Sequence, residues 1–406
     1  MKRSWLHGVA CVVAGVAAAG PAEAQKTYDP GATDTEIKIG NIIPYSGPAS
    51  AYGIIGKTHE AYFRMVNDAG GVNGRKIKYI SYDDGYSPPK AVEQARKLVE
   101  SDEVLFVFQP LGTPSNTAIR RYMNQKKVPQ LFVATGATTF GDPKAFPYTI
   151  GWQPNYQSEG LIYAAYILKT MPSAKIAILY QNDDFGKDYL KGLTDGLGAK
   201  ASSMLIAQAT YEVADPTVDS QMVKLKASGA DVFLNIGTPK FAAQAIRKAG
   251  ELDWRPTQFL TNVSVSIGGV LKPAGLDNAR NVISAAYQKD PVDPTWNDDA
   301  GRKEWAAFMD KYYPDGDRTN NLTVYGYLVG QAVVQVLKQA GDNLTRDNIM
   351  KEAANLKNVE LGMLLPGIRM NSSADDFYPI EQMQLMKFDG ESWRLFGEVL
   401  SGEARK

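Results

Sequence analysis

Cysteine and histidine are nearly absent from this chain of 406 residues, which contains one of the first and two of the second. Cys11 and His7 both lie in an N-terminal segment that we expect to be removed. Without Cys11 the chain cannot form a disulfide, even in an oxidising compartment. Only His59 then remains, which excludes zinc sites built from several cysteine and histidine ligands. We therefore expect no metal site and no cofactor.

His59 is also the only histidine available to a catalytic triad. It lies in residues 56–71, a stretch with helical spacing, and it falls beside the polar face of that helix. We expect a solvated side chain, since nothing nearby completes a Ser-His-Asp arrangement. The aspartate pairs at 83–84 and 183–184 follow predicted strands, where turn and cap roles are commoner than catalysis. The chain is therefore not expected to be an enzyme, and it has no catalytic residues to name.

The first 24 residues have the layout of a signal peptide. Lys2 and Arg3 give a basic start, residues 9–20 form an apolar core, and "AEA" at 22–24 offers small residues before a cut. The core is too short to span a bilayer, and no later apolar run reaches about 18 residues. We expect cleavage after residue 24 and a periplasmic mature chain. Cys11 lies inside the core rather than after it, which disfavours lipid attachment.

Neither charge sign is in excess. Cleavage would remove Lys2, Arg3 and Glu23, so the basic count falls from 44 to 42, the acidic count falls from 44 to 43, and the net charge is −1. Nothing in this balance favours a nucleic acid as partner. The remaining 382 residues (406 − 24) suffice for about two domains of ordinary size.

Predicted strands and helices alternate in two successive units, which favours two parallel sheets covered by helices. Strands of the first unit are expected at 37–43, 76–82, 104–109 and 130–135, with a helix at 88–102. Strands of the second are expected at 175–181, 204–211, 231–237 and 258–262, with helices at 185–198 and 241–250. A strand at 281–287, helices near 301–313, 322–340 and 346–357, and strands at 382–388 and 393–399 follow. No linker separates the units, so the chain is expected to cross between lobes more than once.

Small, hydroxyl-bearing loops follow the strands of the first unit. They read "SGPASAYG" at 46–53, "QPLGTPSN" at 109–116 and "ATGATTF" at 134–140. Ligands of open parallel sheets bind at the carboxyl ends of strands, where helix N-termini favour an anion. Each loop alone is explained by helix capping, but three in one lobe favour a site for a compact carboxylate. No phosphate-binding loop or dinucleotide fingerprint is present in the sequence.

Three stretches resemble the periplasmic solute-binding proteins of ABC transporters, in the branched-chain amino acid (leucine/isoleucine/valine) group. They are "IKIGNIIPYSGPASAYG", "NDAGGVNGRKIKYISYDDGYSPPKAVEQARKLV" and "ATGATTF". The resemblance covers essentially the whole mature chain. It implies the type I periplasmic binding protein fold, α/β with two Rossmann-like lobes and a three-segment hinge. The lobes would comprise residues 34–151 plus 282–359 and residues 152–281 plus 360–400.

The resemblance also implies a ligand site between the lobes. The matching positions are Tyr52, Thr113, Gly136 and Thr138 in the first lobe, and Phe185, Thr238 and the Asn262–Val263 turn in the second. Amino-acid binders of the group usually place an acid at the Asn262–Val263 position to pair with the ligand ammonium. That acid is missing here, and a buried ammonium without a charged partner is costly. The expected ligand is therefore a small carboxylate without an α-amino group, aromatic or aliphatic.

The expected mechanism is closure of the lobes around the ligand, followed by recognition of the closed monomer by an ABC transporter membrane permease. Three alternatives remain open: a binder of branched-chain amino acids, a sensory module of the same fold, and a two-domain oxidoreductase or hydrolase. Turnover of a ligand by the pure protein would favour an enzyme. Neighbouring genes for a permease and an ATPase would favour transport over sensing.

Overall fold

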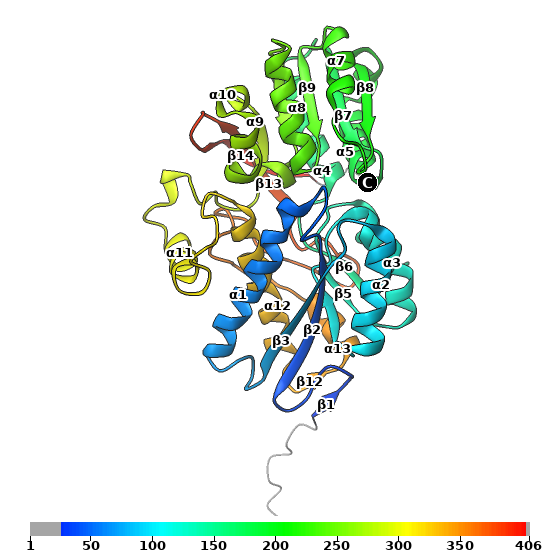
Figure 1. Ribbon diagram of the computed structural model, residues 1–406, viewed down its shortest axis with the longest axis vertical. Coiled ribbons are helices and arrows are strands. Elements are labelled where there is room, and N and C mark those ends of the chain that lie inside the picture. The colour runs from blue at the N-terminus through cyan, green and yellow to red at the C-terminus, as the bar shows by residue number, and fades with distance from the viewer. Residues whose placement is uncertain (1–25, 403–406) are drawn as a thin grey trace, which may run out of the picture.

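The computed structural model describes residues 26–402 and consists of two lobes, each built around its own sheet (Figure 1). The predicted signal peptide lies outside the described residues. Within residues 26–402 no helix is both long and apolar enough to cross a membrane. That stretch also contains no group of three or more His, Cys, Asp or Glu side chains placed to hold a metal ion.

The first lobe contains a five-stranded sheet in the order β3-β2-β4-β5-β6, and all its pairings are parallel. Its strands are β2 (Glu36–Ile43), β3 (Lys76–Asp83), β4 (Phe106–Phe108), β5 (Gln130–Val133) and β6 (Thr149–Gly151). In β2, Ile37, Ile39, Ile42 and Ile43 are all buried. Strands covered on both faces read as continuous apolar runs, and this is why β2 was predictable from sequence.

The second lobe contains a seven-stranded sheet in the order β14-β13-β11-β10-β9-β7-β8. Its strands are β7 (Ile176–Gln181), β8 (Leu205–Tyr211), β9 (Val232–Ile236), β10 (Thr257–Leu260), β11 (Ile283–Ala286), β13 (Gln382–Phe388) and β14 (Trp393–Ser401). The first five pair in parallel, whereas β13 runs antiparallel to β11 and β14. Two short strands, β1 (Thr27–Tyr28) and β12 (Asn343–Leu344), form a separate parallel pair. The predicted α/β fold with parallel-sheet cores is confirmed, with a mixed edge on the second sheet.

Helices cover both sheets. Their bounds are α1 (Gly53–Asp68), α2 (Pro88–Arg96), α3 (Thr113–Gln125), α4 (Tyr156–Thr170), α5 (Asp184–Leu197), α6 (Ala201–Met204), α7 (Asp219–Ala227), α8 (Pro239–Glu251), α9 (Lys272–Ala274), α10 (Leu276–Ala279), α11 (Ala300–Tyr312), α12 (Leu322–Ala340) and α13 (Arg346–Ala353). Helices α1 and α12 approach closely because Gly326 and Gly330 face Thr58 and Tyr62. A Cβ atom at these glycines would lie 2.9 and 2.5 Å from the two side chains.

The chain passes between the two sheets three times. It leaves β6 for α4 and β7, leaves β11 for α11 and α12, and leaves α13 for β13. Gln288 and Leu364 form a bridge between two of these crossings. Strand β11 belongs to the second sheet, and the Phe377 carbonyl still accepts a hydrogen bond from Gly151 N–H of β6. The second crossing therefore begins after β11, C-terminal to the boundary expected at residue 282. The third begins after Phe377, C-terminal to the boundary expected at residue 360.

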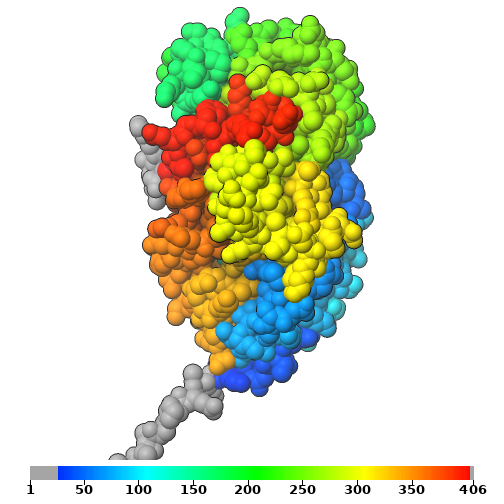
Figure 2. All heavy atoms as spheres, turned by 90° about the vertical axis from the view of Figure 1, so that its left-hand side faces the viewer, coloured from blue at the N-terminus to red at the C-terminus, as the bar shows by residue number. Residues whose placement is uncertain are grey.

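The segment around α11 connects the two lobes on the outside of the hinge. Figure 2 shows this segment, in yellow, between the C-terminal strands and the N-terminal part of the chain. Arg394 Nη1 of β14 donates to Asp293 Oδ1 over 2.9 Å, and Arg64 Nη2 of α1 donates to the Tyr312 carbonyl over 2.7 Å.

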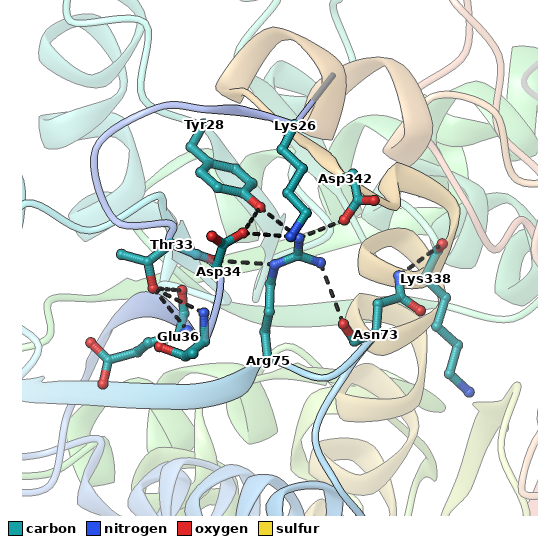
Figure 3. A network of polar contacts seen from close by, with 10 residues as sticks. Lys26, Tyr28, Thr33, Asp34, Glu36, Asn73, Arg75, Lys338 and Asp342 are labelled. Atoms are coloured by element: carbon teal, nitrogen blue, oxygen red, sulfur yellow. Dashed lines mark hydrogen bonds and ion pairs between the residues drawn. The ribbon is translucent and has the colours of Figure 1, made fainter. Parts of the chain in front are cut away.

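A buried arginine holds the N-terminal arm against the first lobe (Figure 3). The Arg75 side chain is 3% exposed and forms an ion pair with Asp342 at 2.5 Å. It also donates to the Tyr28 hydroxyl and to the Thr33 carbonyl. Residues before β2 and residues after α12 are thereby joined to the loop that precedes β3.

The prediction that His59 is solvated is wrong. The side chain is fully buried and its ring centroid lies 4.8 Å from that of Phe108. Burial lowers the pKa of His59 to about 3, so the imidazole is neutral. The exposed face of α1 is formed by Lys57, Glu60, Arg64 and Asp68, whereas His59 lies on the side of the helix that packs against Phe108 of the sheet.

Candidate functional site

The carboxyl ends of the strands in both lobes border one cavity. About 790 Å³ of atom-free space lies there, part of it continuous with solvent. Tyr52 OH of the first lobe donates to the Val263 carbonyl of the second over 3.2 Å, so the two lobes touch at the edge of this cavity.

Aromatic side chains form much of the cavity wall. They are Tyr52, Tyr86, Tyr156, Phe185, Tyr287 and Tyr325. Burial raises the pKa of each of these five tyrosine hydroxyls, so all of them stay protonated. Tyr156 stacks on Tyr189 at a centroid distance of 5.0 Å and meets Phe185 edge-on at 4.9 Å. Such a wall suits an aromatic or aliphatic group.

Five helices begin at the cavity. Tyr52, Gly112, Thr238 and Asn321 precede the first residues of α1, α3, α8 and α12, and Phe185 is the second residue of α5. All five residues line the cavity. The first N–H groups of a helix have no partner within the helix, and the helix dipole makes that end positive. In α5 and α12 these groups are already used by Asp183 and Asn320, and at the start of α1 the Gly53 N–H donates to the Ser50 carbonyl. The N-termini of α3 and α8, which have no side-chain cap, are the ends that favour an anionic group in the cavity.

Thr113 is the first residue of α3, the helix that follows β4. Its hydroxyl lies 2.7 Å from that of Thr135, and its side chain is 2% exposed. Gly112, just before it, has φ of +99°, and a Cβ atom there would lie 2.3 Å from the Tyr86 ring. Only glycine meets both requirements, so Gly112 lets the chain pass beneath Tyr86 and present Thr113 to the cavity.

Thr138 lies apart from the cavity lining and contacts the other lobe. Its N–H donates to Asp188 Oδ2 over 2.6 Å, and its hydroxyl donates to Asp188 Oδ1 over 3.0 Å. Gln157 and Tyr378 complete the contact, donating to Asp188 and to the Thr138 carbonyl. Burial raises the pKa of Asp188. The structure therefore places Thr138 in a contact between α5 and the loop after β5.

Gly136 also lies outside the cavity lining, although it supports it. The Tyr156 N–H donates to the Gly136 carbonyl over 2.8 Å. A Cβ atom at Gly136 would lie 2.5 Å from the Pro154 carbonyl oxygen and 2.9 Å from the Tyr156 ring. The glycine allows Tyr156 to approach this loop and take its place in the wall.

In the second lobe, Phe185 and Thr238 are held by buried hydrogen bonds. Asp183 accepts from the N–H groups of Phe185 and Gly186, which is the cap role expected for that aspartate. The Thr238 N–H donates to the Tyr211 hydroxyl over 2.9 Å. In the first lobe Asp83 has the expected turn role, accepting from the N–H groups of Tyr45, Ser46 and Gly85.

A buried carboxylic acid, Glu159, fixes the turn that contains Asn262. It accepts from Asn262 N–H over 2.9 Å and from the Asn262 side-chain amide. The hydroxyls of Tyr163 and Tyr189 lie 2.5 and 2.6 Å from its oxygens. Burial raises the pKa of Glu159 to about 7, against the effect of these four hydrogen bonds. The Asn262 amide nitrogen is thus committed to Glu159, and its oxygen is the atom left for a ligand.

Two charged residues line the hinge end of the cavity. Lys289 forms an ion pair with Asp299 at 2.7 Å and donates to the Gly362 carbonyl, so its charge is already compensated. Asp290 accepts from Val292 N–H over 2.8 Å, and burial raises its pKa to about 7. Asp290 is the only acid among the residues that line the cavity in the described part of the chain.

Of the residues named from sequence, the structure brings five to the cavity: Tyr52, Thr113, Phe185, Thr238 and Asn262. Tyr86 was missed although it follows the end of β3, where the strand-end rule could have found it. Tyr325 and Asn321 belong to α12, which follows no strand directly, and no signal in the sequence marked them. Glu159 does not line the cavity but hydrogen-bonds to Asn262, which does, and no signal in the sequence pointed to it.

A fold with two sheets, three crossings and a ligand-sized cavity between the lobes defines a two-lobed solute-binding protein. The profile of the family described as periplasmic binding protein matches residues 36–392. The chain belongs to this family, whose members bind substrates rather than transform them. Membership implies an extracytoplasmic location.

Curated relatives and solved structures agree with this assignment. A "Leu/Ile/Val-binding protein homolog 1" of Brucella abortus is 27% identical over 340 residues, 81% of this chain and 86% of the relative. A branched-chain amino acid ABC transporter structure from Thermus thermophilus with bound valine has a TM-score of 0.80 at 14% identity, covering 90% of this chain and 97% of that one. A fatty acid ABC transporter substrate-binding protein from Thermomonospora curvata has a TM-score of 0.77 at 22% identity, covering 93% and 95%. These two neighbours establish the fold alone.

Proposed function

We propose that this protein captures a small carboxylate without an α-amino group, aromatic or aliphatic, and delivers it to an ABC importer. The observation that carries the proposal is that α3 and α8, whose N-termini have no side-chain cap, begin at one cavity whose wall is largely aromatic. The helix ends and the Thr113 hydroxyl would bind the carboxylate. The rings of Tyr52, Tyr86 and Phe185 would enclose the apolar part of the ligand.

The absence of an acid at position 262 argues against an ammonium group. Asn262 has an amide where amino-acid binders of the group have an acid. The neighbouring Glu159 carboxyl already accepts four hydrogen bonds, from Tyr163, Tyr189 and Asn262. Burying an ammonium there would cost several kcal/mol without a partner. A ligand with a carboxylate alone avoids this cost.

Closure of the lobes would couple binding to delivery. The contacts from Tyr52 to Val263 and from Thr138 to Asp188 join the lobes and would stabilise a closed form. A ligand that contacts both lobes would bind the closed form more tightly than the open form and so shift the equilibrium toward closure. The permease would then recognise the closed form.

Isothermal titration of refolded, ligand-stripped protein tests the proposal with three compounds of one skeleton. They are 3-phenylpropanoate, its amide, and phenylalanine. We expect the acid to bind at least about a hundredfold more tightly than the amide, because the helix ends and hydroxyl favour the charged group. Tighter binding of phenylalanine than of the acid would overturn the proposal.

A second candidate is a ligand that carries an amino group. Asp290 lines the cavity and could pair with an ammonium in its ionised form. The names of the Brucella relatives and the valine-bound neighbour point the same way. Binding of phenylalanine that is lost in Asp290→Asn, and kept in the surface control Asp277→Asn, would establish this candidate instead.

A further inference from the structure

The hinge end of the cavity contains two buried amide oxygens without a partner. Gln288 is 8% exposed and Asn321 is 7% exposed, and both line the cavity. Gln288 Oε1 and Asn321 Oδ1 accept no hydrogen bond from the described residues. A buried acceptor left unsatisfied costs about 1–3 kcal/mol, so two such atoms at one end of a binding cavity call for an occupant that donates.

The orientation of the Gln288 amide is fixed by its own hydrogen bond. Its Nε2 donates to the Asn321 carbonyl over 2.9 Å. The other atom of the amide must then be the oxygen, so Gln288 presents an acceptor and not a donor. Gln288 also sits on a hinge crossing, paired with Leu364, which leaves its backbone little freedom.

The Asn321 side chain does not cap helix α12, although its position is that of the N-cap residue. It precedes the first residue of α12, where asparagine usually caps the helix with its side chain, yet it makes no such bond. Asn320 Oδ1 accepts from Leu322 N–H instead, over 3.1 Å. One turn along the helix, the Tyr325 hydroxyl lines the same cavity but is satisfied by Gln109 and Gln153. Gln109 also has an unpartnered Oε1 but does not line the cavity, so among the described residues that line it the unpartnered amide oxygens are those of Gln288 and Asn321.

Gln288 and Asn321 come from other elements of the cavity lining than Thr113, the hydroxyl that would bind the carboxylate. Thr113 begins α3, whereas Gln288 lies on a hinge crossing and Asn321 precedes α12. A ligand that contacts both Thr113 and Gln288 needs a hydrogen-bond donor in addition to its carboxylate.

We propose that Gln288 and Asn321 form a subsite for a hydroxyl group that the ligand carries in addition to its carboxylate. This inference rests on the proposed function and narrows it to hydroxylated acids. A hydroxyl suits neutral amide acceptors, since it donates without bringing a charge into a buried place. A site built to accept from a hydroxyl also discriminates against the analogue that lacks it.

Matched pairs of acids test the subsite by isothermal titration. The pairs are 4-hydroxybenzoate with 4-methylbenzoate, and 3-(4-hydroxyphenyl)propanoate with 3-(4-methylphenyl)propanoate, which cover two ligand lengths. For at least one pair we expect the hydroxyl acid to bind about tenfold more tightly or better. We expect Gln288→Met and Asn321→Leu each to reduce that ratio to near one.

Gln258→Met is the matched control. Gln258 in β10 is also buried with an unpartnered Oε1, but it does not line the cavity, so the hydroxyl preference should persist in this variant. Equal binding of both acids in every pair, or a preference that survives in both Gln288→Met and Asn321→Leu, would overturn the subsite and leave the proposed function standing. If none of the four acids bound, the proposed function would fail and the subsite with it.

Discussion

Two neighbouring strands of the first sheet end in loops of similar composition that do different things. The loop after β4 brings Thr113 to the cavity, with the N-terminus of α3 behind it. The loop after β5 brings Thr138 to Asp188 in α5 of the other lobe. One threonine thus faces the proposed ligand, whereas the other joins the lobes when they close.

The difference shows what the strand-end rule specifies and what it leaves open. The rule identifies an edge of the sheet, and both threonines lie at that edge. Which loop reaches the ligand depends on where the second lobe closes, and this is set by the hinge and by α5. We therefore expect Thr113 to affect ligand selectivity and Thr138 to affect the equilibrium between open and closed forms.

The largest effect is expected from removing both hydroxyls. Thr113→Val with Thr138→Val should abolish detectable binding of 3-phenylpropanoate while the fold stays intact. Thr113→Val alone removes a hydrogen bond to a carboxylate, about 1.5–3 kcal/mol, which is about a ten- to hundredfold loss of affinity. Titration calorimetry measures the affinity, and circular dichroism checks the fold. Unchanged affinity in the double variant would mean that the site is misplaced.

A change of ligand class is expected from the second lobe. Asn262→Asp restores an acid where amino-acid binders of the group have one. Combined with Glu159→Gln, so that the new carboxylate does not face the Glu159 carboxyl, it should increase the affinity for phenylalanine about tenfold. Asn320→Asp, at the start of α12, controls for a general effect of added negative charge. A gain in the control equal to that in Asn262→Asp would show that position 262 is not special.

The stability of the folded protein should depend on pH through Glu159, the buried acid that hydrogen-bonds to Asn262. Burial raises its pKa from 4.5 to about 7, so the folded protein holds a proton that the unfolded chain releases near pH 4.5. Stability contributed by this proton is full below about pH 4.5 and is lost as the pH rises through 7. Glu159→Gln cannot titrate and should flatten the fall in Tm between pH 5 and 8. Parallel Tm curves for the two proteins would contradict this assignment.

The smallest effect is expected from the contact between the lobes. Asp188→Ala removes the acceptor for Thr138 and should weaken the binding of every ligand by a similar factor, about fivefold. Because only the closed form is destabilised, the ratio of acid to amide affinity should stay as in the parent protein. Loss of that ratio in Asp188→Ala, or its retention in Thr113→Val, would remove the distinction between the two threonines.

The sequence was sufficient for most of the fold. The isoleucine-rich sequence of β2 and the regularly spaced apolar residues of α8 identify a strand and a helix from local sequence alone. Less of the candidate site could be predicted from the sequence. Tyr52 and Asn262 follow strands and could be placed, but Asn321 and Tyr325 reach the cavity only because α12 packs along α1 at Gly326 and Gly330. The His59 prediction was wrong because His59 lies beside the exposed face of α1 formed by Lys57, Glu60, Arg64 and Asp68, on the side that packs against Phe108.

A thermal-shift screen of refolded, ligand-stripped protein tests the ligand class most directly. The panel contains leucine and valine beside benzoate-type, phenylpropanoid and short aliphatic acids, and amides. A ligand at a hundred times its Kd stabilises the protein by about 2.7 kcal/mol, enough to raise Tm by several degrees. We predict that acids raise the Tm and that leucine and valine do not. A rise with leucine or valine and none with the acids would contradict the proposed ligand class.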